Sequence, residues 1–117
     1  MKSGIDQVTL EHRSTCPIAR SLDLMGDKWT LLIMRDALFL RCRTFADFAC
    51  GRERIPTNLL SDRLRKLVGM GLLEKVPYQE RPLRHEYRPT DLGKALKPVL
   101  RAMKSYGEQH LGGHTKY

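Results

Sequence analysis

The chain has 117 residues, an apolar content of 41% and a formal net charge of +8 at pH 7. This length suits one domain, and the ordinary apolar content argues against wholesale disorder. The chain lacks both a run of about 18 apolar residues and the apolar core of a signal peptide at its start, so we expect a cytoplasmic protein without a transmembrane helix. Three cysteines, an odd number, suit a reducing compartment better than a disulfide framework.

The excess positive charge is concentrated in one part of the chain. Residues 35–104 hold 16 Lys or Arg and 8 Asp or Glu, whereas the other residues hold 5 of each sign. A concentrated basic region is the electrostatic footprint of a polyanion binder. Membrane contact calls for a long basic amphipathic helix with Trp or Phe on its other face, and none of the predicted helices has this pattern. Nucleic acid is therefore favoured over a membrane surface.

Two helices are predicted in the first third of the chain, after a flexible arm at residues 1–15. Cys16 is the expected N-cap of the first helix, because Pro17 favours the first helical position. The apolar stripe of this helix consists of Ile18, Leu22 and Met25. Asp27 caps a second helix over about residues 28–39, which is apolar nearly all round and should therefore form the centre of the core.

A short third helix is predicted over residues 45–50, followed by a turn at residues 51–54. Thr44 is its expected N-cap. Asp47 stands at the third helical position and completes a capping box, with Asp in place of the usual Glu.

The fourth helix is predicted from residue 56 or 57 to residue 70, with Gly71 as a left-handed C-terminal cap. One side of it carries an apolar stripe, made of Leu60, Leu64 and Leu67. The opposite side carries hydrogen-bonding groups rather than the usual mixture of Glu and Lys: Asn58, Asp62 and Arg65, flanked by Ser61 and Lys66. An ordinary amphipathic surface helix is the alternative for this segment taken alone.

A change to period two predicts a two-stranded hairpin over residues 73–89, with its loop at residues 80–84. Pro77 and Pro89 restrict its strands to edge or terminal positions. The tip of this hairpin is basic.

Thr90 caps a last helix over residues 91–110, and residues 112–117 are predicted to be a disordered tail. The apolar stripe of this helix consists of Leu92, Leu96, Val99, Leu100 and Met103. Tyr106 and Leu111 extend the apolar surface beyond what one small domain can cover. Together with the stripe of the first helix, this surface favours a homodimer with an obligate interface of about 2,000 Å² or more.

The order of these elements predicts a mainly α fold with a small β-hairpin, the winged helix-turn-helix. A short helix joined by a tight turn to a helix with an outward polar face is a helix-turn-helix. The basic hairpin behind it is the wing. In this architecture the second helix enters the major groove of DNA and the first crosses the backbone.

Six segments carry a family resemblance: Cys16-Pro-Ile-Ala-Arg20, Gly26-Asp-Lys-Trp-Thr-Leu-Leu-Ile-Met-Arg35, Arg43-Thr-Phe-Ala-Asp-Phe48, Leu60-Ser-Asp-Arg-Leu-Arg-Lys-Leu67, Gly71-Leu72 and Glu86-Tyr-Arg-Pro-Thr-Asp-Leu-Gly93. Over about residues 16–111 the chain resembles the HxlR-type winged helix-turn-helix regulators of bacteria, which are related to the MarR group. The resemblance implies a homodimer that binds a palindromic operator and changes transcription. The apolar stripes described above predict that this dimer is joined through the N- and C-terminal helices. The residues after Phe48 depart from the pattern, with Cys50 and a basic Arg52-Glu-Arg54 turn.

Side-chain chemistry suggests which residues of the fourth helix contact DNA. Base-edge contacts are expected from Thr57, Asn58, Ser61, Asp62 and Arg65. Asn suits adenine, Arg suits guanine, and Asp can accept a hydrogen bond from the amino group of cytosine. Arg63 and Lys66 lie on the flank of this set and are expected to meet phosphates or acidic partners.

Further DNA contacts are expected outside the fourth helix. Arg43 and Thr44 lie where a helix N-terminus can hold a phosphate. Arg81 and Arg84, at the tip of the hairpin, should reach the DNA backbone or the minor groove. Four residues are expected to lie in the core and to have no binding or catalytic role: Trp29, Leu60, Leu64 and Leu67.

Cys16 is a candidate redox sensor. The positive end of a helix dipole favours the reactive thiolate, and Arg13 and Arg20 are near in sequence. The family resemblance adds that some members sense oxidants, quinones or aldehydes through a cysteine at this position. The equal alternative is that Cys16 is simply a small buried N-cap residue, while Cys42 and Cys50 are expected to be incidental.

We expect no enzyme active site, no cofactor and no metal site. The sequence contains no recognisable Ser/His/Asp arrangement, phosphate loop or paired carboxylates, and the cysteines and four histidines lack metal-ligand spacing. The alternative to a DNA-binding regulator is a winged helix used for protein contact, which would not need the concentrated positive charge. The sequence therefore favours a homodimeric regulator of double-stranded DNA, with a small molecule or an oxidant as its effector.

Overall fold

The computed structural model describes residues 14–117, so the predicted arm at residues 1–15 lies almost entirely outside the described residues. Within that range the elements follow the predicted order. They are α1 (Pro17–Met25), α2 (Thr30–Phe39), α3 (Phe45–Ala49), α4 (Thr57–Gly69), β1 (Leu73–Glu80), β2 (Leu83–Pro89), α5 (Asp91–Lys94) and α6 (Lys97–His110). The predicted winged helix-turn-helix fold is confirmed.

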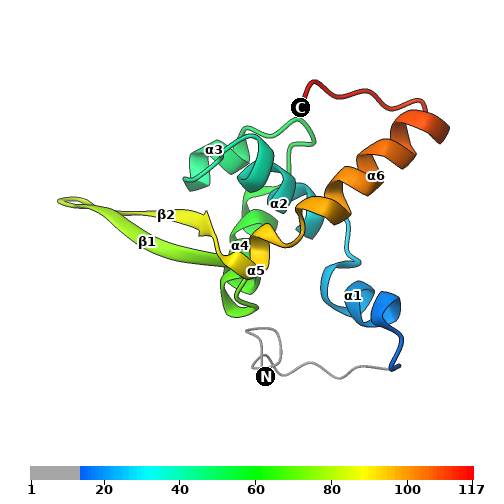
Figure 1. Ribbon diagram of the computed structural model, residues 1–117. Coiled ribbons are helices and arrows are strands. Elements are labelled where there is room, and N and C mark those ends of the chain that lie inside the picture. Colours follow the sequence, from blue (N-terminus) through cyan, green and yellow to red (C-terminus); the bar gives the residue numbers. More distant parts are fainter. Residues whose placement is uncertain (1–13) are drawn as a thin grey trace.

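Figure 1 shows a small helical body built around α2, α3 and α4. The antiparallel hairpin of β1 and β2 projects from one side of this body, and α1 and α6 extend on the other side. Within the described part of the chain, every helix is too short or too polar to cross a membrane.

The core lies where α2, α3 and α4 meet the start of β1. The inner stripe of α4, Leu60, Leu64 and Leu67, is at most 1% exposed. Phe48 of α3 and Met34 of α2 are equally buried. The other apolar core residues are Met25, Ile33, Ala37, Ile55, Met70, Leu72, Leu73 and Leu96. The prediction that the second helix and the leucine stripe of the fourth form the core is therefore confirmed.

Helix α2 begins at Thr30, two residues later than predicted. The carboxylate of Asp27 accepts hydrogen bonds from the backbone N–H groups of Trp29 (3.0 Å) and Thr30 (3.1 Å), which holds the preceding residues in a turn. Trp29, predicted to be core, is only half-buried and packs against the edge of the core. There the Lys28 ammonium lies 4.9 Å from the centre of its ring.

The C-terminus of α4 is closed by Gly71, as predicted. Gly71 has a positive φ of 78°, which a residue without Cβ adopts at little cost. Leu72 N–H bonds to the carbonyl of Leu67 and Gly71 N–H to the carbonyl of Val68, both at 3.0 Å. These two bonds form a Schellman motif, which turns the chain directly from α4 into β1.

The hairpin covers the predicted residues, but its strands are longer and its loop is shorter than predicted. The strands pair up to Glu80 and Leu83, so the tip is only Arg81–Pro82 instead of a loop over residues 80–84. Tyr78 forms a bulge and has no cross-strand partner, directly after Pro77, which has no N–H to donate to the ladder. The predicted loop residues therefore extend the wing.

Two contacts attach the base of the wing to the body. The backbone N–H of Tyr87 in β2 donates to the carbonyl of Arg43 at 2.6 Å. The Tyr87 ring also meets the Phe48 ring edge to face, with 6.4 Å between centroids. The hairpin is thus tied to both the connector after α2 and the centre of α3.

The predicted last helix is divided into α5 and α6. Pro98 has no N–H for the carbonyl of Lys94, and its ring would crowd that carbonyl in a continuous helix. The chain therefore makes a tighter turn at Ala95 and Leu96, where Leu96 N–H bonds to the carbonyl of Gly93 at 3.0 Å. The break allows α6 to leave the body in its own direction (Figure 1).

Residues 112–117 form neither helix nor strand, but they fold back onto the body rather than extending from it as the predicted disordered tail. The Tyr117 ring stacks on the Phe39 ring, with 6.1 Å between centroids and 20° between planes. The Lys104 ammonium contacts the Tyr117 carbonyl oxygen. The tail thus lies over α2 and α6.

Gly93 allows α5 to pack against the turn between α4 and β1. Thr90, the predicted cap of this helix, accepts from the N–H of Gly93 and donates from its hydroxyl to the carbonyl of Gly71. A Cβ at position 93 would lie 2.1 Å from the Leu72 carbonyl oxygen and 3.1 Å from the Met34 terminal methyl. No side chain larger than hydrogen fits there without movement of the backbone.

We expect Gly93→Ala to lower the free energy of unfolding by about 1–3 kcal/mol, because α5 must move away from Leu72. Gly69→Ala is the matched control, since a Cβ there meets no heavy atom within 4 Å. The control should leave stability unchanged or raise it by up to about 1 kcal/mol. Urea denaturation of both variants measures the difference, and coincident curves for the two would contradict the packing described here.

Candidate nucleic-acid interface

Residues 50–56 join α3 to α4, and Arg35 of α2 holds this connection. Its guanidinium donates two hydrogen bonds to the Glu53 carboxylate, Nη2 to Oε1 at 2.7 Å and Nη1 to Oε2 at 3.0 Å. Its Nε donates to Oδ1 of Asp36 at 2.9 Å. The bonds from Arg35 lower the pKa of the Glu53 carboxyl. The pair therefore stays ionised at neutral pH and fixes the turn that precedes α4.

The two sides of α4 differ as predicted. Its inner side is the buried leucine stripe, and its outer face consists of Thr57, Asn58, Ser61, Asp62 and Arg65. All of these are exposed except Asp62, whose side chain is 36% exposed, while that of Arg65 is 80% exposed. Lys66, beside this face, is 62% exposed. The outer face thus presents hydrogen-bonding groups to solvent along about two and a half turns of helix.

Arg63 forms its hydrogen bonds with other residues of the chain. Its side chain is only 18% exposed. Its Nε donates to Oδ2 of Asp27 at 3.0 Å, and its Nη1 donates to Oδ2 of Asp62 at 2.6 Å. Arg63 was predicted to meet either phosphates or acidic partners. In the structure its guanidinium is bonded to two acidic side chains of the same chain.

The Asp27 carboxylate joins the start of α2 to α4. Burial alone would raise its pKa, but hydrogen bonds from the Thr30 side chain, from Arg63 and from two backbone N–H groups outweigh burial and lower the pKa to about 2. Asp27 is therefore ionised at neutral pH and bonded to Arg63 across 36 positions of sequence.

Asp62 has cationic partners on both carboxylate oxygens. Its Oδ1 accepts from Nη2 of Arg65 at 3.1 Å, its Oδ2 accepts from Arg63, and the Lys66 ammonium lies 4.0 Å from Oδ2. The hydrogen bond from Arg65 is the largest cause of a lowered pKa of the Asp62 carboxyl. A base contact, as predicted for Asp62, would have to share these oxygens.

Arg43 and Thr44 are also engaged within the chain. Nη1 of Arg43 donates to the carbonyls of Ala37 (2.9 Å) and Cys42 (2.8 Å). The predicted capping box is present: Thr44 Oγ1 accepts from the N–H of Asp47, whose carboxylate accepts from the backbone N–H groups of Arg43 and Thr44. These two backbone bonds are the main reason that the pKa of Asp47 is lowered. A carboxylate of the chain thus sits where a phosphate was predicted, and we leave Arg43 and Thr44 out of the interface proposed below.

The predicted wing cations, Arg81 and Arg84, are exposed at the tip of the hairpin. Two apolar side chains accompany them, Leu83 at 62% and Tyr78 at 47% exposure. Sequence reasoning did not assign these two residues, although an exposed apolar side chain beside cations at a hairpin tip is a usable signal. The tip stands far from the body (Figure 1) and therefore presents both kinds of group freely.

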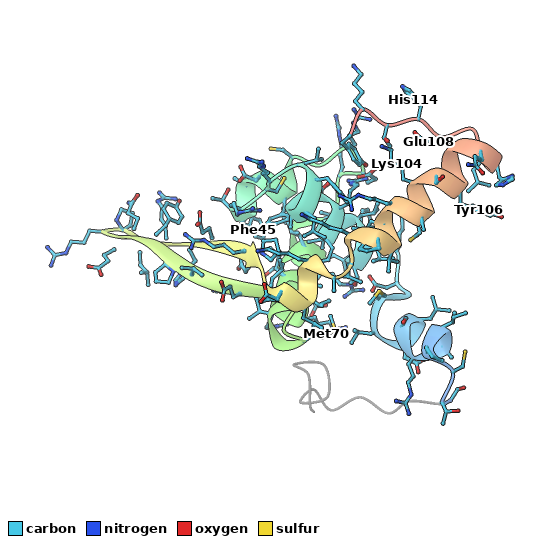
Figure 2. The ribbon with its side chains drawn as sticks, viewed as in Figure 1. Phe45, Met70, Lys104, Tyr106, Glu108 and His114 are labelled. Atoms are coloured by element: carbon cyan, nitrogen blue, oxygen red, sulfur yellow. The ribbon has the colours of Figure 1, made fainter. Side chains whose placement is uncertain are left out.

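Large exposed apolar side chains gather on α1 and α6. On α1 they are Ile18 (72%) and Leu22 (57%). On α6 and just beyond it they are Val99, Met103, Tyr106 and Leu111. Figure 2 shows Tyr106 pointing away from the body, whereas Lys104 lies on the side of α6 that faces the C-terminal tail. A groove of about 480 Å³ lies between α2, α6 and this tail.

Cys16 is the N-cap of α1, as predicted. It is exposed, not buried as its structural alternative expected, and its side chain makes no capping hydrogen bond. Arg20, predicted to assist it, donates from Nε to the Ser14 carbonyl, while Arg13 lies outside the described residues. Cys50 is exposed, and burial raises the pKa of the half-buried Cys42 thiol. Among residues 14–117, no group of three His, Cys, Asp or Glu side chains is arranged to hold a metal ion.

Sequence comparison places relatives of this chain among regulators. It is 43% identical over 94 residues to an uncharacterized helix-turn-helix-type transcriptional regulator of Mycobacterium tuberculosis, a match that covers 80% of this chain. The chain spans 58% of the length of that relative. Residues 24–115 match the family described as HxlR-like helix-turn-helix.

Solved structures agree with this assignment. The structure of PA1607 matches with a TM-score of 0.76 and 39% identity, covering 90% of this chain and 71% of that one. The redox regulator HypR, in its reduced form, matches with a TM-score of 0.69 and 28% identity, covering 80% of this chain and 92% of that one. With most of its length matched, the chain belongs to the HxlR-like helix-turn-helix family.

Proposed function

We propose that this protein regulates transcription by binding double-stranded DNA sequence-specifically, as a homodimer on a palindromic operator. The observation that carries the proposal is the outer face of α4, which offers amide, hydroxyl and guanidinium groups to solvent while its inner side is fixed in the core. A helix held in this way fits the major groove, which is about 12 Å wide.

Three residues of the outer face are free to contact bases. Thr57, Asn58 and Ser61 are exposed, and no hydrogen bond of their side chains to another described residue competes with DNA. Asn58 suits adenine, to which an amide can bond in two places, and Arg65 suits O6 and N7 of guanine. Lys66, at the flank, is placed for a phosphate.

The wing supplies a second contact. Arg81 and Arg84 are exposed at a tip that reaches beyond the body, which suits backbone or minor-groove binding next to the site of α4. These cations belong to residues 35–104, which hold twice as many basic as acidic side chains. The positive electrostatic potential of this region favours DNA as the partner. The alternative, a winged helix used for protein contact, would not need this charge.

A DNA titration over a range of salt concentrations tests this proposal. Log affinity for an operator selected from random fragments should fall linearly with log salt, by about 0.9 per phosphate contact. Arg65→Ala should cost about 1–3 kcal/mol at one base pair, whereas Arg84→Ala should weaken binding to all sequences and reduce the slope by about 1. Lys116→Ala, which removes an exposed cation of the tail, is the charge control. A flat salt response would favour the protein-contact alternative.

The dimer is proposed from the apolar side chains that α1 and α6 leave exposed. Ile18 and Leu22 lie on one helix, and Val99, Met103 and Tyr106 on the other. Both helices extend from the body on the side opposite to the wing, so a partner there would leave α4 and the wing open (Figure 1). Two-fold symmetry would then place two α4 helices about 34 Å apart, one turn of duplex.

Sedimentation at micromolar concentration tests the dimer. We expect a dimer for the unmodified protein and a monomer for Met103→Glu, because a buried unpaired carboxylate opposes association. Leu83→Glu is the matched control, since it places the same charge on an exposed apolar residue of the wing. A monomeric unmodified protein, or equal dissociation of both variants, would contradict the assignment of the interface.

Control of the regulator is proposed at Cys16. Its thiol is exposed and begins α1, one of the two helices proposed to form the dimer. HypR, which has the same fold at 28% identity, is a redox regulator. Modification of Cys16 would therefore add bulk or charge at the edge of the dimer interface and alter the spacing of the two α4 helices.

Treatment with diamide or a quinone should change the operator affinity of the unmodified protein several-fold and leave that of Cys16→Ser unchanged. Cys50→Ser removes another exposed thiol and should respond like the unmodified protein. If the unmodified protein does not respond, or if the response is lost in Cys50→Ser instead, Cys16 is only the structural N-cap of α1. Fluorescence anisotropy with labelled operator provides the affinities.

A further inference from the structure

We propose that Asp62 acts on DNA through Arg65, as a positioning residue, rather than by contacting a base itself. This inference rests on the proposed DNA-binding function and adds a specificity-determining residue to it. It also changes the role that the residue type alone suggests, which is acceptance of a hydrogen bond from cytosine.

The first step is the occupancy of the Asp62 carboxylate. Oδ1 accepts from Nη2 of Arg65 at 3.1 Å, and Oδ2 accepts from Nη1 of Arg63 at 2.6 Å. A bond from a base would have to be made in addition to these, or replace one of them. Replacement would release a guanidinium, and Arg63 lies in a site that is only 18% exposed. Asp62 is therefore better suited to hold its two arginines than to read DNA.

The second step is the anchor of this arrangement in the body of the protein. Arg63 donates from Nε to Asp27 at 3.0 Å, and Asp27 in turn accepts from the backbone N–H groups at the start of α2. The chain of contacts thus runs from α2 through Asp27, Arg63 and Asp62 to Arg65. The position of Asp62 is set by the body as well as by α4.

The third step is the effect of the hydrogen bond to Asp62 on the conformation of Arg65. Its side chain is 80% exposed, and Asp62 is the only partner that the structure gives its guanidinium among residues 14–117. A free arginine samples many rotamers, and fixing one of them on binding costs entropy. Asp62 holds one donor of the five-donor fork and leaves the others for a guanine edge. Pre-ordering of this kind strengthens recognition at a base pair that Asp62 does not touch.

The fourth step concerns charge. A carboxylate on a DNA-facing helix repels the phosphate backbone, so Asp62 weakens binding to every sequence. Its removal should therefore raise affinity for unrelated DNA while it lowers discrimination at the base pair of Arg65. If the ion pair only stabilised α4, removal of Asp62 would not raise affinity for unrelated DNA while lowering discrimination at one base pair.

A double-mutant cycle tests the proposal, with Asp62→Asn, Arg65→Ala and the double variant. Binding is measured to the operator and to every single-base-pair substitution of it. We expect Arg65→Ala to reduce discrimination about 5- to 150-fold at one base pair. Asp62→Asn should reduce discrimination at the same base pair, and should add less than about twofold in the Arg65→Ala background, because residues that act as one unit are not additive.

Glu108→Gln is the charge control, since it removes one acid from the exposed surface of α6 and should leave discrimination unchanged (Figure 2). The inference is overturned if Asp62→Asn alters discrimination at a different base pair, or if the effects of the two substitutions multiply. If the unmodified protein itself binds all sequences equally, the proposed function fails and the role of Asp62 fails with it. The two failures are therefore distinguishable.

The contact can also be checked without DNA, by NMR titration of the Asp62 carboxyl in the free protein. Arg65→Ala should raise the pKa of this carboxyl, because the hydrogen bond from Arg65 is the main cause of its lowering. Glu108→Gln should leave the titration unchanged. An Asp62 pKa that is insensitive to Arg65→Ala would show that the two side chains are not paired in solution, and would overturn the proposal.

Discussion

The burial of three leucines on one side of α4 is the constraint on which the rest of this structure depends. Leu60, Leu64 and Leu67 are almost completely removed from water, and burial of each contributes about 1.5–3 kcal/mol. Successive residues of a helix are rotated by about 100°, so a shift of one position would turn a different set of side chains outward. The core therefore decides which residues form the outer face, and the helix that stabilises the core also carries the proposed recognition surface.

Two partly buried ion pairs complete the placement of α4. Arg35 holds the turn before the helix through Glu53, and Arg63 holds the helix itself through Asp27. Ion pairs of this kind contribute little net stability, because removal of the charges from water offsets their attraction. Their value lies in geometry: one links the turn before α4 to α2, the most buried helix of the body, and the other links α4 itself to the start of α2. Both arginines belong to the basic region of the chain, yet neither is free to meet DNA.

The remaining surfaces divide the molecule into two sides. The wing projects on one side with exposed cations at its tip, and α1 and α6 leave apolar side chains exposed on the other. Pro98 is essential to this division, because it interrupts the helix that would otherwise continue from α5 into α6. The proposed contacts between subunits and the proposed contacts with DNA therefore involve different elements of one small domain. Asp27 lies in the turn between α1 and α2 and bonds to Arg63, so the end of α1 is linked directly to α4.

Most of the fold could be predicted from the sequence, because its signals are local. Helical periodicity, the Thr44 capping box, the left-handed Gly71 and the alternation after it all depend on residues a few positions apart. The sequence also separated the inner from the outer side of α4, since periodicity alone determines that separation. The local errors include the loop of the hairpin, which is shorter than predicted, and the single last helix, which Pro98 interrupts.

The roles of the charged residues were decided only by the tertiary structure. Arg63, Arg65 and Asp62 look equivalent as members of a polar helix, and nothing near them in sequence indicates that Asp27, 36 positions from Arg63, binds one of them. Likewise, the sequence predicts that Asp47 belongs to a helix cap. Only the folded connector brings its carboxylate to the backbone N–H groups of Arg43 and Thr44, where a phosphate was predicted. Sequence determines which side of a helix faces water, because that depends on period. Which charges remain available there depends on partners that only folding brings within hydrogen-bonding distance.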